Sequence, residues 1–355
     1  MPPLEEYMEE IAPLFETKWL TNMGEKHKVL EELVKDYLKV PYVSLTVNGH
    51  MALENIIKAL DLQGEIITTP FTFISTTHAI VRCGCTPVFC DINPYDYTID
   101  VEKIESLITP KTVAIMPVHV YGNICDVDRI EKIAKKHGLV VIYDAAHAFG
   151  EMYYDKSVAG FGTASIFSFH ATKVFNTVEG GCIAFSDEAL IQVLKDIKNF
   201  GFNGEENVCY IGGNAKMNEF SAAMGICNLR HIDDEIAKRK KVYHYYKEIL
   251  EGIEGIHIWK EQKYVKHNYA YFPVVFEAEF GKDRDQVLLE LKKHNIYARK
   301  YFYPITTDFQ CYEGQFNHYC LDTARDISSK VLTLPMYADL EKNDVERICD
   351  IVLKK

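Results

Sequence analysis

Short hydrophobic runs alternate with amphipathic stretches in the first half of the chain, between about residues 43 and 190. The runs are rich in Val, Ile and Phe and are apolar on both faces, which is typical of buried strands in a parallel sheet. The stretches between them, such as residues 126–137, place apolar residues at helical spacing. The pattern predicts a mostly parallel sheet with helices on both sides and strands at residues 65–69, 86–90, 113–120, 139–143, 165–169 and 182–185.

The pattern changes in the second half of the chain. Residues 218–251 are typical of long helical structure that begins apolar and becomes strongly charged. A strand-like run at residues 269–276 then precedes a helical stretch at residues 283–294. We therefore expect an α/β protein with two domains, a large one over residues 1–235 and a smaller α+β domain over residues 236–355.

The overall charge argues against two classes of partner. The chain of 355 residues has a formal net charge of -12 at pH 7 and an estimated pI near 5.6. Nucleic acids and anionic membrane surfaces need clustered Lys and Arg, so neither is expected to bind. Any phosphate group on a ligand must therefore be held by a local arrangement of donors.

The cysteines and the first residues bear on the compartment. Ten cysteines are scattered through apolar segments without a Cys-x-x-Cys pair, which favours reduced thiols over a metal site. The chain begins without a basic leader, and no run approaches the 18 or so apolar residues of a membrane span. We expect a cytoplasmic protein.

An aspartate and a lysine carry the strongest chemical signal. Asp144 ends an apolar strand, and Lys173 follows 29 residues later among small and aromatic residues. A partly desolvated lysine can bind an aldehyde as a Schiff base, and an aspartate can keep a pyridine nitrogen protonated. A single lysine is far more often a solvated surface charge. The pair of residues in this context favours pyridoxal phosphate chemistry.

A possible phosphate site precedes this pair in the sequence. Asn48 can cap a helix that begins near Met51, and Gly49 permits close approach of the backbone. Unpaired amides at such a helix start bind phosphate without a basic side chain. An ordinary capped helix explains the same residues, and only the later Asp and Lys favour the phosphate site.

Several ordered motifs together resemble the DegT/DnrJ/EryC1/StrS family of sugar aminotransferases over nearly the whole chain. The resemblance implies the fold-type I architecture of pyridoxal phosphate enzymes, with a large domain built on a mostly parallel mixed sheet and a small C-terminal α+β domain. The motifs are residues 19–24 (WLTNMG), 48–53 (NGHMAL), 70–76 (PFTFIST), 117–122 (PVHVYG), 144–147 (DAAH), 168–173 (SFHATK), 179–181 (EGG) and 214–223 (NAKMNEFSAA).

The resemblance implies a role for each matching residue. Lys173 is similar to the Schiff-base lysine that later shuttles a proton, and Asp144 to the partner of the pyridine nitrogen. The other residues that resemble cofactor contacts are Phe73 and Ala146 on the two faces of the ring, His147 at the ring hydroxyl, and Gly49, His50, Ser168 and Asn214 at the phosphate. Phe73 and His147 could equally be core residues, which is the commoner role of each type.

Asn214 resembles an asparagine that reaches the phosphate in the neighbouring subunit, which implies a homodimer with shared active sites. Candidates to line the substrate cleft are Trp19, Asn22, Lys216, Tyr301 and Tyr303, although Trp19 and Tyr301 could instead be packing residues. Two positions depart from the family pattern. His50 replaces a common Thr. Lys216 replaces a common Arg, so the compact ammonium group of lysine stands where the family commonly has a planar guanidinium.

The implied reaction transfers an amino group from glutamate to a nucleotide-linked 4-keto-6-deoxyhexose. The motifs most resemble those of the subgroup that converts dTDP-4-keto-6-deoxyglucose to dTDP-4-amino-4,6-dideoxyglucose. Amination at the 3-position, or a UDP or GDP carrier, would use the same cofactor machinery. A pyridoxal phosphate-binding regulator without turnover is a further alternative, disfavoured because Lys173 and Asp144 are both present and no DNA-reading helix is visible. Some relatives replace the lysine by His and act as dehydratases, so Lys173 favours transamination.

Overall fold

A seven-stranded sheet forms the centre of the larger part of the molecule in the computed structural model, which describes residues 1–354. Its strand order is β1-β9-β8-β5-β4-β2-β3. β8, β5, β4, β2 and β3 pair in parallel, and β9 pairs antiparallel with both β1 and β8, so that β9 alone of the seven strands runs in the opposite direction. The bounds are β1 Tyr42–Thr46, β2 Glu65–Thr68, β3 Thr86–Phe89, β4 Thr112–Met116, β5 Val140–Asp144, β8 Ala164–Ser168 and β9 Gly181–Phe185. The expectation of an α/β fold with a mostly parallel mixed sheet is confirmed.

The orientation of β9 follows from the short connection that precedes it. Residues 169–180 link β8 to β9 without a helix, whereas the crossover between parallel neighbours usually contains one. This segment instead folds back on itself as a turn. Ala171 N donates to Val178 O at 2.8 Å, and Thr177 N donates to Phe169 O at 2.9 Å. The turn carries Lys173.

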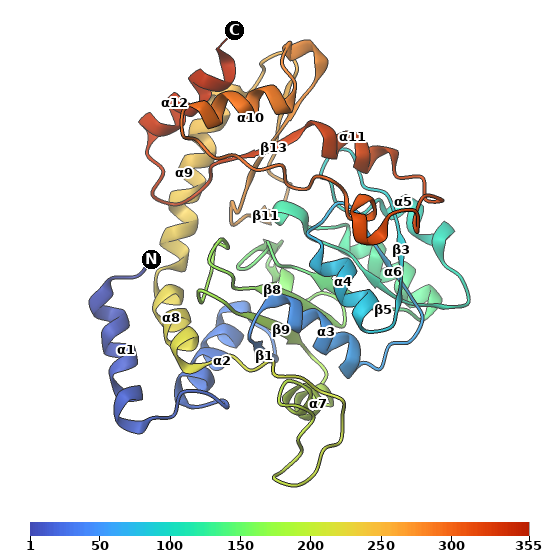
Figure 1. Cartoon of the computed structure of the whole chain (residues 1–355), viewed down its shortest axis with the longest axis vertical. Coiled ribbons are helices and arrows are strands. Elements are labelled where there is room, and N and C mark those ends of the chain that lie inside the picture. Colours follow the sequence, from blue (N-terminus) through green and yellow to red (C-terminus); the bar gives the residue numbers. More distant parts are fainter. Residues whose placement is uncertain (355) are drawn as a thin grey trace.

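Helices cover both faces of the sheet (Figure 1). On one face, α3 (Gly49–Ala59), α4 (Ser75–Arg82) and α7 (Leu190–Ile197) share a core with Ile142 of β5. On the other, α2 (Glu25–Leu38) and α6 (Val127–His137) share a core with Tyr143. Neighbouring residues of a strand point to opposite faces, so the apolar runs of the sequence are buried on both. β4 is shorter than the predicted 113–120 because Pro117 lacks an N–H for the ladder.

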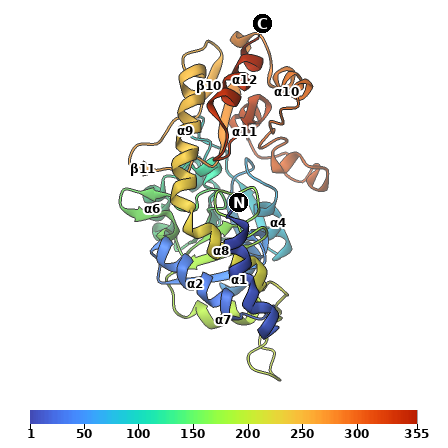
Figure 2. The ribbon, with the colours of Figure 1, turned by 90° about the vertical axis from the view of Figure 1, so that its left-hand side faces the viewer.

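The predicted helical stretch at residues 218–251 is two helices, α8 (Glu219–Arg230) and α9 (Ile232–Leu250). Figure 2 shows them end to end, with α9 rising beside α12 (Lys342–Leu353). The upper part contains an antiparallel sheet of β10 (Ile256–Ile258), β12 (Phe272–Phe276) and β13 (Val331–Leu334), together with α10 (Arg284–Lys293) and α11 (Asp322–Lys330). The predicted helix at residues 283–294 is thus confirmed. The domain boundary at residue 235 stays a prediction, and α9 runs through it.

A small sheet joins the C-terminal part to the central one. β11 (Val265–Lys266) pairs with β6 (Met152–Tyr153), which also pairs with β7 (Lys156–Ser157). The remaining helices are α1 (Leu4–Thr17) and α5 (Val101–Ile104). Within residues 1–354, no helix combines the length and apolar character that a membrane crossing requires.

Candidate functional site

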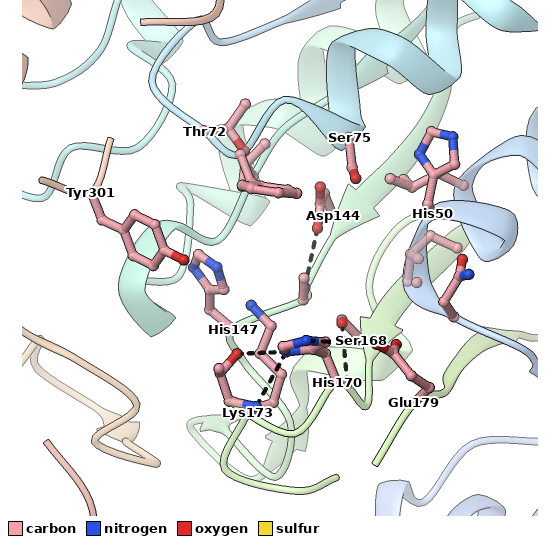
Figure 3. A pocket seen from close by; sticks show the side chains of 18 of the residues that line it. His50, Thr72, Ser75, Asp144, His147, Ser168, His170, Lys173, Glu179 and Tyr301 are labelled. Atoms are coloured by element: carbon pink, nitrogen blue, oxygen red, sulfur yellow. Dashed lines mark hydrogen bonds and ion pairs between the residues drawn. The ribbon is translucent and has the colours of Figure 1, made fainter. Parts of the chain in front are cut away.

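A cavity of about 290 Å³ opens where β5 and β8 end and α3 begins. Ligands of parallel sheets bind beyond the carboxyl ends of the strands, and this cavity has that position. Eight of the nine residues predicted to hold the cofactor line it: Gly49, His50, Phe73, Asp144, Ala146, His147, Ser168 and Lys173. Figure 3 shows His50, Asp144, His147, Ser168 and Lys173 converging from several elements, with the Lys173 side chain pointing into the cavity.

Asp144 is the last residue of β5 and is 5% exposed. Its Oδ2 accepts a hydrogen bond from Thr76 Oγ1 at 2.7 Å, and its Oδ1 accepts one from Ala146 N at 3.1 Å. Burial raises the pKa of this carboxyl, while the two hydrogen bonds and the charge of Lys173 act in the opposite direction. Both hydrogen-bond donors are neutral, so the carboxylate would gain most from a cation, such as a protonated pyridine nitrogen.

Lys173 is held by its turn and by a contact across the cavity. Its backbone N donates to His170 O at 2.8 Å, and the following side chains, Val174 and Phe175, are buried. Its Nζ donates to the hydroxyl of Tyr271 at 3.3 Å. The turn therefore fixes the backbone of Lys173 next to the core, and its side chain lines the cavity.

His147 is a buried neutral imidazole with a defined tautomer. Its Nδ1 accepts a hydrogen bond from Tyr121 N at 3.0 Å, which leaves the proton of the neutral ring on Nε2. Burial lowers the pKa of His147 well below its ordinary value, and the charge of Lys173 adds to this effect. The imidazole is therefore a hydrogen-bond donor in the cavity wall. Such a donor suits the hydroxyl oxygen of a pyridoxal ring.

The start of α3 forms a cradle with the end of β8. Asn48 Oδ1 accepts from Met51 N at 2.9 Å, while the amides of Gly49 and His50 belong to the first turn, which has no intrahelical partners. A Cβ on Gly49 would lie 2.9 Å from the Cβ of Ser168. The absence of a side chain thus keeps open a place bounded by two amides and the Ser168 hydroxyl, which fits a phosphate group.

The His50 side chain is directed at a carboxylate. Its Nε2 lies 3.0 Å from Glu54 Oε1, one helical turn further on. Glu54 is 3% exposed, and its Oε1 also forms a salt bridge with Arg82 Nε. The Nε2 of the imidazole is therefore directed at Glu54, while Nδ1 and the backbone N–H at the helix start remain available.

Phe73 and Ala146 complete the wall. Phe73 is 53% exposed, so the alternative reading of this residue as a core aromatic is wrong. An exposed ring at a cavity edge can cover a flat ligand, and the small Ala146 leaves room for one. Together with Asp144, His147 and the cradle at Gly49, the residues present fit pyridoxal phosphate.

The predicted substrate residues are divided between the cavity and other surroundings. Tyr301 lines the cavity, whereas Trp19, Asn22, Lys216 and Tyr303 do not. Lys216 Nζ donates to Asn199 Oδ1 at 2.6 Å, and the Tyr303 ring lies 4.6 Å from the guanidinium carbon of Arg284. Asn214 is exposed and also lies outside the cavity of its own chain.

The site contains residues that were not predicted, among them Thr76 and Tyr271, which bond to Asp144 and Lys173, and Arg299, which lines the cavity. Thr76 stands in a quoted motif, and its contact with Asp144 appears only in the fold. From the C-terminal part, Tyr271 contacts Lys173 and Arg299 lines the cavity. Arg299 donates from Nη1 to the hydroxyl of the predicted Tyr301 at 3.0 Å, only two residues further along the chain. No local signal marks Tyr271, because Lys173 lies 98 residues away in the sequence.

Comparison with known proteins agrees with this geometry. Residues 4–353 match the DegT/DnrJ/EryC1/StrS aminotransferase family. The chain is 44% identical over 352 residues to a dTDP-4-amino-4,6-dideoxy-D-glucose transaminase of Shigella dysenteriae, covering 99% of this chain and 96% of that one. It is 41% identical over 360 residues to an enzyme of the same name from Escherichia coli, covering 100% and 96%.

The crystal structure of DesI in the presence of its TDP-sugar product superimposes with a TM-score of 0.95 at 31% identity, covering 100% of this chain and 91% of DesI. This likeness confirms the fold-type I architecture that the motifs implied. The cavity and the match over the whole chain lead to one assignment. The chain belongs to the DegT/DnrJ/EryC1/StrS aminotransferase family.

Proposed function

We propose that the protein is a pyridoxal phosphate-dependent aminotransferase that converts dTDP-4-keto-6-deoxyglucose to dTDP-4-amino-4,6-dideoxyglucose with glutamate as donor. The observation that carries the proposal is the convergence of the Lys173 amine, the buried Asp144 carboxylate and the neutral His147 on one cavity. The choice of sugar is supported by two relatives, 44% and 41% identical, that are named for this product.

Each residue has a task that its surroundings support. When bound, pyridoxal phosphate supplies an electron-withdrawing ring that stabilises negative charge next to the transferred nitrogen. Lys173 would bind the cofactor covalently and, once displaced, move a proton at Nζ. Asp144 would hold the ring nitrogen and His147 Nε2 the ring oxygen, while the Gly49 and His50 amides and Ser168 Oγ would bind the phosphate.

Arg299 supports an anionic substrate. The contacts of its guanidinium are with Tyr301, through the hydroxyl at 3.0 Å and the ring centroid at 5.6 Å. Its charge therefore lacks an acidic neighbour within residues 1–354. A guanidinium pairs well with a carboxylate or a diphosphate. Glutamate and a nucleotide sugar each carry such a group.

A second copy of the chain is part of the proposal. The loop at residues 199–214 projects beyond α7 (Figure 1) and exposes Phe200, Phe202, Val208, Tyr210 and Ile211, the last at 94%. A cluster of exposed apolar side chains marks a protein interface. Asn214, which ends this loop, is then available to a partner's cofactor phosphate, as in a homodimer with shared sites.

The ten free thiols are in keeping with the proposed cytoplasmic location.

Absorbance spectroscopy tests the proposal. The protein with pyridoxal phosphate is expected to absorb visible light, to lose that band with glutamate, and to regain it with dTDP-4-keto-6-deoxyglucose. Lys173→Ala should abolish the band and turnover, while the control Lys132→Ala, at an exposed position of α6, should retain both. A wild-type protein that glutamate leaves unchanged would contradict the reaction. Recovery with a UDP, GDP or 3-keto sugar alone would reassign the acceptor.

A further inference from the structure

Tyr271 reaches the lysine of the site from the C-terminal part of the chain. It directly precedes β12, and 98 residues separate it from Lys173. The Lys173 Nζ lies 3.3 Å from its hydroxyl oxygen and 5.8 Å from its ring centroid. The hydroxyl accepts the hydrogen bond, and the amine donates it.

Packing on several sides fixes the Tyr271 ring. Its centroid lies 4.7 Å from that of His147 and 5.8 Å from that of Tyr121. The next residue, Phe272, is fully buried and paired with β13. Asn268 connects the segment that carries Tyr271 to the segment that carries His147. Its side chain accepts a hydrogen bond from Ala270 N at 3.0 Å and donates one to His147 O at 2.8 Å. The hydroxyl is therefore held in place relative to His147 and the cavity.

The direction of the hydrogen bond matters for a lysine that moves a proton. A neutral amine has one lone pair and two N–H groups. If one N–H donates to Tyr271, rotation about the Cε–Nζ bond is restricted and the lone pair points away from the tyrosine. The long flexible side chain of lysine would otherwise sample many directions, and misplacement by about 1 Å can cost on the order of 100-fold in rate.

We propose that Tyr271 is a positioning residue that orients the free amine of Lys173 for proton transfer. This inference rests on the aminotransferase function proposed above. In the transfer, the Nζ lone pair would take the proton from the donor carbon, and the resulting ammonium would give that proton to the cofactor carbon attached to the transferred nitrogen, so no other reactant is needed.

Tyr271→Phe is the sharpest test, because it removes the hydroxyl and retains the ring contacts with His147 and Tyr121. The kcat is expected to fall about tenfold, which corresponds to about 1.4 kcal/mol and to the usual worth of one hydrogen bond. The KM for glutamate and the dissociation constant of pyridoxal phosphate should stay within about twofold, since binding groups are untouched. Proton transfer should become more rate-limiting, so the primary isotope effect with α-deuterated glutamate should rise. Tyr95→Phe, at an exposed position 90% open to solvent, is the matched control.

Crystal structures of the cofactor-free proteins give a readout apart from activity. The wild type should show Lys173 Nζ at the Tyr271 hydroxyl, and Tyr271→Phe should show the amine in several rotamers. A variant with wild-type kcat and isotope effect, or with a raised KM alone, would overturn the positioning role. A single unchanged Lys173 rotamer in the variant would do the same. The wild-type response to glutamate separately decides the proposed function.

Discussion

The cradle at the start of α3 makes a quantitative prediction for Gly49→Ala. The added Cβ would lie 2.9 Å from Ser168 Cβ and 3.1 Å from Ser168 Cα. The Cα belongs to β8, where Ser168 is paired with Gly181, so this atom cannot rotate away. The helix start and the strand end must separate by a few tenths of an ångström. The groups that would hold the phosphate lie on both sides of that contact.

The expected loss can be worked from this overlap. Overpacking of a well-packed contact costs about 1–3 kcal/mol. The overlap can be relieved by separating the amides of α3 from Ser168, which are the protein groups that would bind the phosphate. The cost then weakens cofactor binding, and the dissociation constant increases about 5- to 150-fold. The Gly49 backbone is helical, so Ala is not strained by its dihedral angles. Ala also lowers the conformational entropy of the unfolded chain, which stabilises the folded protein by about 0.4–1 kcal/mol. The stability of the cofactor-free protein should therefore change less than its affinity for the cofactor.

Titration of pyridoxal phosphate into the cofactor-free protein, followed by visible absorbance, measures the dissociation constant. Urea unfolding without cofactor measures stability. Gly160→Ala is the control, because its Cβ would meet only the end of the flexible Lys156 side chain, at 3.4 Å. An unchanged dissociation constant for Gly49→Ala, or an equal increase for Gly160→Ala, would refute the reasoning.

Two other changes probe the charges and the core. Arg299→Gln should raise the KM for glutamate about 10- to 150-fold, because a hydrogen bond to a charged group contributes about 1.5–3 kcal/mol, while the cofactor absorbance stays the same. Stopped-flow bleaching by glutamate checks this, and a defect confined to the keto-sugar step would assign Arg299 to the nucleotide. His27 is buried with neither ring nitrogen hydrogen-bonded, and burial lowers its pKa to about 3. Because the unfolded chain takes up this proton near pH 6.5 and the folded chain does not, stability falls by about 1.4 kcal/mol per pH unit on acidification through this window. His27→Leu should therefore flatten the loss of stability between pH 6.5 and pH 4 in urea unfolding, and an unchanged slope would contradict the assignment.

The sheet could be predicted because its signals are local. Each central strand is a short apolar run, and the polar residue at its end marks the edge at which ligands bind. Asp144 ends β5, and Lys173 lies in the turn between β8 and β9. Both positions follow from the order of strands along the chain. The cavity therefore contains the predicted cofactor residues with the exception of Asn214.

The residues contributed by the C-terminal part could not be predicted in this way. Packing of β12 and β13 above the main sheet brings Tyr271 to Lys173, 98 residues away in the sequence, and pairs the backbone of Arg299 with Thr333, 34 residues away. Lys216 is a different case. Its position in a motif suggests a substrate contact, which stays a prediction, and in the single chain its amine bonds to Asn199 and lies over the Phe200 ring. A motif fixes the place of a residue in the chain, whereas its contacts depend on the fold.

His50 differs from both cases, because a local rule would have explained it. With His50 in place of the common Thr, the sequence leaves either a backbone amide or the imidazole to contact the phosphate. Glu54 stands four residues later, and residues at this spacing face one another on a helix. Burial alone would raise the pKa of Glu54, and the hydrogen bond and charge of Arg82, with the charges of His50 and Lys58, bring it below its ordinary value. A carboxylate that is 3% exposed needs such partners. The Nε2 atom of the histidine is therefore accounted for by the carboxylate behind it, whereas the amides of the helix start remain free to form the phosphate cradle.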